Sequence, residues 1–213
     1  DNQTAVVRMS SMAAALILQE QGTEANMQMV CRDRNRIAMQ SYILGAAALG
    51  INNLLVLSGD HQKFGDHPQS KNVFDLDSVN LIATIKMMRD ERRLLSGQEL
   101  PEGSEPRLFI GAAYNPFADP EELQLIRLEK KIRAGAKYVQ TQAIYNIERF
   151  AGWMEKVRAH GLHERAHMLA GIIVNRRVRS IEATSGVPGM DIPEPLIERM
   201  RRAEDKEAEG VAM

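Results

Sequence analysis

The chain has 213 residues and a formal net charge of −1, from 27 Lys and Arg against 28 Asp and Glu. This length is enough for one domain with a sizeable buried core, and the balanced charge indicates no nucleic-acid or polyanion partner. The single cysteine, Cys31, excludes a disulfide framework and is typical of a reducing cytoplasm. The apolar stretches are far too short to span a bilayer and no signal peptide is present, so we expect a cytoplasmic protein with no membrane partner.

The first half of the chain alternates between helical and strand patterns. Apolar residues at helical spacing and short apolar runs predict helices over residues 4–21 and 36–49 and strands over residues 26–30 and 53–57. The second strand has no polar alternation, which is typical of a strand buried on both faces. It ends in Ser58-Gly59-Asp60, and a polar loop then continues to Ser78. Loops of that length inside a compact domain are usually functional or disordered.

The second half repeats the alternation, with the Gly/Pro/Glu-rich residues 96–106 as an expected surface linker. Pro120 is expected to open one of the helices, with Asp119 as its cap. The expected helices cover residues 78–95, 120–133, 147–159, 178–185 and 194–209. The expected strands cover residues 108–113, 137–142 and 168–174.

Strands that alternate with helices predict parallel βαβ units and an α/β fold. A doubly wound sheet would usually carry a Gly-rich phosphate turn after its first strand, and none is found here. A (β/α)8 TIM barrel needs about 250 residues, and the chain starts at Asp1 rather than at Met. We therefore predict a single partial TIM-barrel domain over residues 1–213 that lacks the first and last strands.

In such a barrel the carboxyl ends of the strands share one face, where active sites lie. Gln140 and Gln142 on this face offer amide donors and acceptors, which suit a flat heterocycle with alternating N–H and C=O groups. Asp60 could hold a further N–H edge or place a negative charge beside a redox-active ring, and Tyr114 could stack. The polar residues expected on this face are Asp1, Asn2, Cys31, Arg32, Asp33, Ser58, Gly59, Asp60, Tyr114, Asn115, Gln140, Gln142 and Asn175.

Structural roles are the alternatives for the same residues. Asp60 could cap the loop that follows it, Gln142 could be a buried amide satisfied by backbone, and Tyr114 could be a packing residue. Cys31 fits a buried packing position better than a thiolate. A local ion-pair cluster is the alternative for Arg32, Asp33 and Arg34. No metal site is predicted, because no fixed ligand spacing supports the histidines His160, His163 and His167.

Five segments resemble the methylenetetrahydrofolate reductase family, a flavin-dependent TIM-barrel family, in their order and spacing. The resemblance covers nearly the whole chain, and the Ala-Gly-Ala and Thr-Gln stretch with its upstream lysine is its most specific part. The segments are Met29-Val30-Cys31, Leu57-Ser58-Gly59-Asp60, Gly111-Ala112-Ala113-Tyr114-Asn115-Pro116, Lys130-Lys131 with Ala134-Gly135-Ala136, and Gln140-Thr141-Gln142.

The resemblance implies an oxidoreductase of one-carbon metabolism that interconverts 5,10-methylenetetrahydrofolate and 5-methyltetrahydrofolate. NAD(P)H would reduce a bound FAD, or alternatively FMN, and the reduced flavin would deliver hydride to the folate. The implied catalytic residues are Asp60 and Gln142. The residues expected at the cofactor are Tyr114, Lys130, Lys131, Asp60, Gly59, His61 and Cys31. The residues expected at the folate substrate are Gln142, Gln140 and Asn2.

The chain also departs from the family pattern, with Gln28 in place of a common histidine and Ser58 in place of a common arginine. These departures motivate an alternative, a non-catalytic pterin-binding barrel that acts as a subunit of a larger one-carbon or methyl-transfer complex. A corrinoid-linked methyltransferase barrel is a third reading, although no residue requires one. For the reductase we expect a homo-oligomer or a subunit of a reductase complex.

Overall fold

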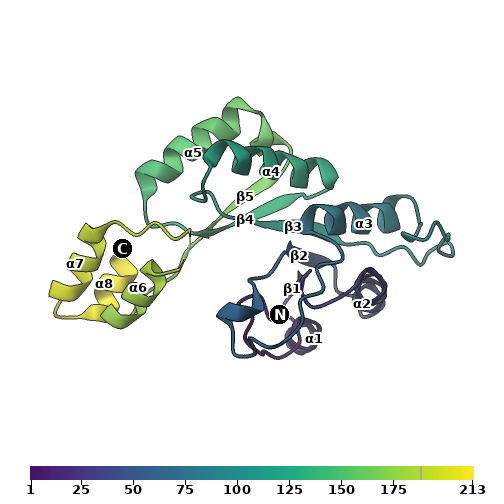
Figure 1. The fold of residues 1–213 in the computed structure, drawn as a ribbon, viewed down its shortest axis with the longest axis horizontal. Coiled ribbons are helices and arrows are strands. Elements are labelled where there is room, and N and C mark those ends of the chain that lie inside the picture. Colours follow the sequence, from purple (N-terminus) through teal and green to yellow (C-terminus); the bar gives the residue numbers. More distant parts are fainter. Residues whose placement is uncertain (188) are drawn as a thin grey trace. The chain divides into compact units, whose positions relative to one another are not determined.

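The computed structural model describes residues 1–187 and 189–213. Strands and helices alternate along these residues in an α/β fold (Figure 1). The strands are β1 (Asn26–Val30), β2 (Asn53–Leu57), β3 (Phe109–Tyr114), β4 (Tyr138–Ala143) and β5 (His167–Gly171). The helices are α1 (Ser11–Glu20), α2 (Arg36–Ala48), α3 (Ser78–Asp90), α4 (Glu121–Ala134), α5 (Ile147–Ala159), α6 (Val178–Ser185), α7 (Glu194–Arg202) and α8 (Lys206–Ala212), with short 3-10 turns at Gln62–Phe64 and Leu162–Glu164.

The sheet has the strand order β1-β2-β3-β4-β5, so each strand neighbours the next one along the chain. β1 pairs in parallel with β2, with Asn26 opposite Asn53, and β2 pairs in parallel with β3, with Asn53 opposite Phe109. Sequential parallel strands joined by helices form the repeat of a (β/α)8 barrel, whereas a doubly wound sheet reverses its order at a switch point. The predicted α/β class is confirmed, and the topology is that of part of a TIM barrel.

The chain divides into two compact units. The first unit comprises Asp1–Ala113 and Lys130–Tyr138, and the second comprises Tyr114–Glu129 and Val139–Met213. The carboxyl ends of β1 and β2 therefore belong to the first unit, and most of β4 belongs to the second. The expectation of a single domain over residues 1–213 stays a prediction.

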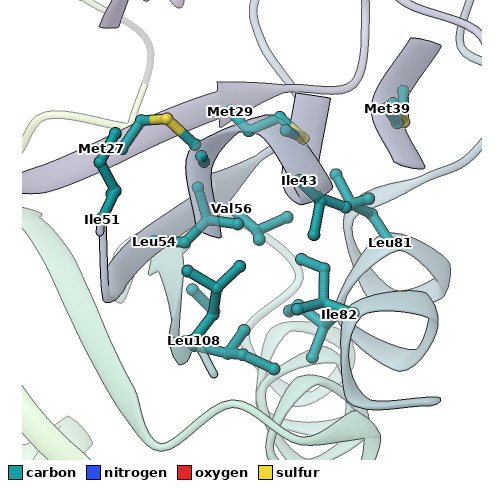
Figure 2. Close-up of a cluster of buried hydrophobic side chains, with 14 of the residues drawn as sticks. Met27, Met29, Met39, Ile43, Ile51, Leu54, Val56, Leu81, Ile82 and Leu108 are labelled. Atoms are coloured by element: carbon teal, nitrogen blue, oxygen red, sulfur yellow. The ribbon is translucent and has the colours of Figure 1, made fainter. Parts of the chain in front are cut away.

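The core of the first unit lies between β1, β2 and helices α2 and α3 (Figure 2). Leu54, Leu55 and Val56 of β2 are all buried, which confirms a strand covered on both faces. Methionine supplies much of the packing, as its flexible thioether fills irregular spaces. Each fully buried side chain of this kind contributes about 1.5–3 kcal/mol. The fully buried methionines of this core are Met27, Met29, Met39 and Met88.

Side-chain caps set the starts of the helices in the first unit. Ser10 accepts a hydrogen bond from the Ala13 amide, Asn35 from those of Ile37 and Ala38, and Asp77 from that of Asn80. The helix predicted over residues 4–21 is wrong in its first turns, because α1 begins only at Ser11. The preceding residues bond instead to the loop after β2, through Asp60 N–H to the Gln3 carbonyl (2.8 Å) and Asp66 N–H to the Ala5 carbonyl (3.3 Å).

Two further helices are shorter than predicted. α3 ends at Asp90 rather than at residue 95, and Arg92 follows with a positive φ of 51°, which a helix does not allow. The helix predicted over residues 194–209 is two helices, because Asp205 caps a new helix by accepting from the amides of Glu207 and Ala208. The predicted bounds of α5 and α6 are confirmed.

In the second unit, the part of α4 up to Glu129 lies beside α5 (Figure 1), and an ion pair of 2.7 Å joins Glu121 to Lys156. Helices α6, α7 and α8 form a separate cluster around Ile181, Ile197 and Met200. Asn175 anchors this cluster, because its side chain bonds the Ser180 hydroxyl at 2.9 Å and the Tyr145 hydroxyl at 2.5 Å. Asn175 is 1% exposed, so it is a structural residue here rather than a group open to a ligand.

Candidate functional site

The carboxyl end of β2 is shaped by Gly59. This residue has a φ of +85°, and a Cβ there would lie 2.3 Å from Val30 Cγ1. Only glycine accepts both the left-handed backbone and the crowding. The chain can therefore turn out of the sheet directly beside β1 and present Asp60 and His61, both exposed, at the strand end. Gly59 thus forms the turn that orients Asp60 and His61, and its predicted contact with a cofactor stays a prediction.

Arg32, two residues beyond the end of β1, holds this strand end together. Its guanidinium forms a bidentate pair with Asp33, at 2.7 Å and 2.9 Å. It also donates to the backbone carbonyl of Asp60 (2.7 Å) and to that of Asn2 (2.7 Å). Arg32 is only 4% exposed, so these bonds satisfy a charge that is almost completely buried. The Arg32–Asp33 pair of the expected local ion-pair cluster is therefore present, whereas Arg34 pairs with Asp1 at 3.1 Å.

Asp60 combines a fixed backbone with an uncommitted side chain. Its N–H donates to the Gln3 carbonyl at 2.8 Å, and its carbonyl accepts from Arg32. Among residues 1–187 and 189–213, its carboxylate forms no hydrogen bond or ion pair. The other aspartates of the first unit all use their carboxylates, on basic side chains or backbone amides. They are Asp1, Asp33, Asp66, Asp75, Asp77 and Asp90.

Asn2 and His61 flank Asp60 with partly committed side chains. The Oδ1 of Asn2 accepts from the Arg8 amide at 2.8 Å, which closes the turn of the first residues. His61 Nδ1 accepts from the Lys63 amide at 3.3 Å and caps the 3-10 turn. The ring of His61 is exposed, so its predicted contact with a cofactor stays a prediction. For Asn2, the side-chain Nδ2 is the group left for a ligand.

Cys31, Lys130 and Lys131, three residues expected at the cofactor, differ in burial and in contacts. Cys31 is fully buried on the helix-facing side of β1, and burial, together with the nearby Asp77 charge, raises the pKa of its thiol to about 12. Lys131 donates from its amine to the Ala113 carbonyl at 2.6 Å, so it supports β3. Lys130 is exposed. Lys130 is thus accessible to a ligand, Cys31 occupies the packing position that was its alternative, and the predicted cofactor contacts of both residues stay predictions.

In the second unit, β4 carries Gln140 and Gln142 on one face. Both are exposed and alternate with the buried Val139, Thr141 and Ala143. Thr141 fixes the strand, because its hydroxyl donates to the Gln142 carbonyl (2.7 Å) and accepts from the Gly171 amide (3.0 Å). The buried-amide alternative for Gln142 is therefore not what the structure shows. The proximity of Gln142 to Asp60 stays a prediction, because the two residues belong to different units.

Tyr114 faces the helix layer rather than solvent. It is 6% exposed, and its ring stacks on Trp153 of α5 with 5.4 Å between centroids. Burial raises the pKa of its hydroxyl to about 12. Among the described residues, neither this hydroxyl nor the Trp153 indole N–H forms a hydrogen bond within ordinary geometry. This is the placement that the packing alternative describes, and the predicted contact of Tyr114 with a flavin stays a prediction.

A cavity of about 420 Å³ lies between α4 and α5 in the second unit. It is lined by apolar groups such as Leu125, Trp153 and Leu162, and by the paired Glu121 and Lys156. Its walls are helical, so it is distinct from the strand ends predicted to hold a heterocycle. Within residues 1–187 and 189–213, no group of three or more His, Cys, Asp or Glu side chains could hold a metal ion. No helix among these residues is long and apolar enough to cross a membrane.

Two structural roles could not be predicted from the sequence. Arg32 is expected at the carboxyl face or in a local ion pair, and the structure adds its hydrogen bonds to the Asn2 and Asp60 carbonyls. Tyr138 of β4 packs in the first unit, where it stacks on Phe109 at 5.5 Å and donates to Asn26 Oδ1 at 2.8 Å. No local pattern predicts that partner, which is 112 residues away.

Residues 1–213 match the family model of methylenetetrahydrofolate reductase. The chain is 25% identical over 185 residues to methylenetetrahydrofolate reductase 1 of Schizosaccharomyces pombe, covering 87% of the chain and 28% of that protein. It is 24% identical over 196 residues to the probable methylenetetrahydrofolate reductase (NADPH) of Caenorhabditis elegans, covering 90% and 26%. The chain thus spans less than a third of the length of these relatives.

Among solved structures, the chain is similar to an uncharacterized protein from Clostridium thermocellum that is described as binding two copies of 5-methyl-5,6,7,8-tetrahydrofolic acid. The TM-score is 0.41 at 18% identity, with 92% of this chain and 83% of that chain covered. Because the family model matches the chain from its first residue to its last, this chain belongs to the methylenetetrahydrofolate reductase family.

Proposed function

We propose that the protein is a flavin-dependent oxidoreductase that interconverts 5,10-methylenetetrahydrofolate and 5-methyltetrahydrofolate, with NAD(P)H as the electron donor. The observation that carries the proposal is the Asp60 carboxylate, exposed at a strand end with its backbone held on both sides and no partner among the described residues. Family membership and the NADPH-linked name of one relative support the same reaction class.

The donor set fits planar heterocycles. An ionised carboxylate accepts hydrogen bonds, so Asp60 can take two adjacent N–H groups, as a pterin ring offers them. Gln142 and Gln140 each offer an amide donor and an acceptor from one exposed face of β4. We assign Asp60 and Gln142 to the reacting rings and Gln140, with the Nδ2 of Asn2, to the rest of the folate.

For the cofactor we propose FAD, with FMN as the alternative. The accessible groups that could hold it are the Asp60 carboxylate, the His61 ring and the Lys130 amine, which could pair with a phosphate. A bound flavin would supply the two-electron carrier between nicotinamide and folate. The negative charge of Asp60 would disfavour the electron-rich reduced ring and so promote hydride delivery to the folate. For the location we propose a reducing cytoplasm, which the free thiol of Cys31 supports. We propose no nucleic-acid partner, because the charge of the chain is balanced.

The absorption spectrum of the purified natural protein, with whatever sequence flanks this chain, tests the proposal. We expect a yellow protein whose flavin band bleaches under anaerobic conditions when NAD(P)H or 5-methyltetrahydrofolate is added. Asp60→Asn should raise the flavin reduction potential and slow hydride delivery to folate. A colourless protein that takes up neither FAD nor FMN would contradict the proposal.

A second candidate function is a pterin-binding subunit of a larger one-carbon or methyl-transfer complex without catalysis of its own. The burial of Tyr114 and of Cys31, two residues expected at a cofactor, favours it. This candidate predicts that calorimetry detects binding of 5-methyltetrahydrofolate while the protein takes up no flavin and transfers no hydride. Hydride transfer by the isolated protein would exclude it. A homo-oligomer or membership of a reductase complex is part of the first proposal.

A further inference from the structure

We propose that Arg32 is a positioning residue for Asp60, so that the Arg32–Asp33 clamp sets the catalytic carboxylate rather than only stabilising the fold. This inference rests on the proposed function of Asp60. The Arg32 guanidinium donates to the Asp60 carbonyl, to the Asn2 carbonyl and to both oxygens of Asp33, at 2.7–2.9 Å. One buried side chain thereby joins the end of β1, the turn after β2 and the first residues of the chain.

Arg32 bonds the main chain of Asp60, and the main-chain position determines where such a short side chain lies. Asp60 has only two side-chain torsions, so the position of its carboxylate follows the position of its main chain. That main chain is held at its N–H by Gln3 and at its carbonyl by Arg32. The absence of a Cβ at Gly59 allows the turn that brings Asp60 here, since such an atom would lie 2.3 Å from Val30 Cγ1. Among the described residues the Asp60 carboxylate itself forms no hydrogen bond or ion pair, so it is available to a ligand.

A planar fork is needed for this arrangement. The guanidinium bonds a carboxylate with two N–H groups and still presents N–H groups to two carbonyls in fixed directions. A lysine would place one compact charge at a single point and could not keep the four bonds at once. Arg32→Lys therefore keeps the charge and removes the geometry.

A similar clamp that holds one carbonyl instead of two occurs in the first unit, at a place without a ligand role. Arg89 pairs with the adjacent Asp90 at 2.7 Å and 3.3 Å and donates to the Leu108 carbonyl at 3.0 Å. Leu108 precedes β3, so this clamp holds the amino end of a strand, opposite to the end where barrel sites lie. Arg89→Lys is thus a matched control, with the same chemistry and sequence spacing and without contact with Asp60.

The experiment compares Arg32→Lys with Arg89→Lys in the flavin-loaded protein. For Arg32→Lys we expect kcat for folate reduction to fall about 10- to 100-fold, because misplacing a reacting group by about 1 Å costs this much. For Arg89→Lys we expect kcat within about twofold of the unsubstituted protein. Thermal melts verify that both variants are folded. Equal kcat values for the two variants would overturn the proposal.

A double substitution separates positioning from general stabilisation. If Arg32 acts through the Asp60 carboxylate, Arg32→Lys should change kcat by no more than about twofold in an Asp60→Asn background, since the group to be positioned is already lost. A full additional loss in that background would contradict the proposal. If Arg32→Lys does not fold, Asp33→Asn against Asp90→Asn makes the same comparison. Failure of the proposed function itself would be recognised separately, as an unsubstituted protein without flavin or turnover.

Discussion

The ring of Tyr138 occupies the space in which a side chain on Gly111 would stand. A Cβ on Gly111 would lie 1.9 Å from Tyr138 Cζ and 2.3 Å from both Cε atoms. Tyr138 also stacks on Phe109 and donates to Asn26 Oδ1, so β1, β3 and the start of β4 meet at this ring. Gly111 is therefore required by the packing of the first unit.

We expect Gly111→Ala to destabilise the protein by about 3 kcal/mol, because the ring cannot move without losing its stack and its hydrogen bond. Denaturant unfolding measures the change. Gly152→Ala in α5 is the control, since a Cβ there meets nothing within 4 Å. Alanine is favoured over glycine in a helix by up to about 1 kcal/mol, so this control should be neutral or stabilising. Equal losses for the two variants would contradict the packing argument.

Cys31 should be protected from alkylation in the folded state. Its thiol is buried and its pKa is raised to about 12, so almost no thiolate exists near neutral pH. We expect iodoacetamide to modify Cys31 at pH 8 in urea and to leave it unmodified without urea, as mass spectrometry would show. Fast alkylation of the folded protein would show that the Cys31 thiol is accessible and would contradict this prediction.

The raised pKa of the Cys31 thiol also predicts how the free energy of unfolding depends on pH. The folded thiol has a pKa above the unfolded value of about 8.5, so the unfolded state releases its proton first. The contribution of the thiol to stability is complete below pH 8.5 and is lost as the pH rises toward 12. Cys31→Ala should show a flatter decline of unfolding free energy over this range. Parallel declines for the two proteins would contradict the prediction.

Sequence reasoning succeeded where one local pattern decides the structure. β2 was predictable because Leu54, Leu55 and Val56 are apolar in succession, as burial on both faces requires. The exposed Asp60 followed from its place directly after that strand. Residues 4–9 could not be predicted in the same way, because their helical pattern competes with backbone bonds to the loop after β2, more than 50 residues away.

The direction of Tyr114 was decided by strand alternation. Successive side chains of a strand point to opposite faces, and Tyr114 shares its face with Ile110 and Ala112, both buried in the helix-facing core. The alternation of side chains along β3 thus predicts that Tyr114 lies on the helix-facing side of the strand, although it does not predict the contact with Trp153 of α5. The Arg32 clamp could not be found in this way, because its acceptors are backbone carbonyls that the sequence does not distinguish.

The hydroxyl of Tyr114 is expected to contribute nothing to stability. It is buried, and its nearest polar group is the Trp153 indole N–H, with which it forms no hydrogen bond of ordinary geometry, so its removal should be close to neutral. Tyr114→Phe should therefore leave the unfolding free energy unchanged or raise it by up to about 1 kcal/mol, with unchanged uptake of flavin. Tyr138→Phe is the matched comparison and should cost about 1 kcal/mol, because that hydroxyl bonds Asn26. A loss of flavin uptake on Tyr114→Phe would restore the predicted cofactor contact.

Substitutions at two adjacent residues of β4 should have different effects, one on ligand affinity and the other on stability. Gln142 is exposed and, among the described residues, its side chain forms no hydrogen bond, whereas Thr141 is buried and bonds both the Gly171 amide and the Gln142 carbonyl. We expect Gln142→Ala to leave the melting temperature unchanged and to weaken binding of 5-methyltetrahydrofolate about 3- to 10-fold, the value of one hydrogen bond. Thr141→Val should instead destabilise the protein by about 1–2 kcal/mol, since it leaves the Gly171 amide unsatisfied.

Calorimetry with 5-methyltetrahydrofolate and thermal melts measure the two effects on the same preparations. Gln140→Ala serves as the neighbouring variant on the same exposed face, and we expect a smaller loss of affinity for it because we assign Gln140 to the periphery of the ligand. Unchanged affinity for both glutamine variants would remove this face of β4 from the folate site. The assignment would then depend on Asp60 and the strand ends of the first unit, where the comparison of kcat between Arg32→Lys and Arg89→Lys still tests the Arg32 clamp.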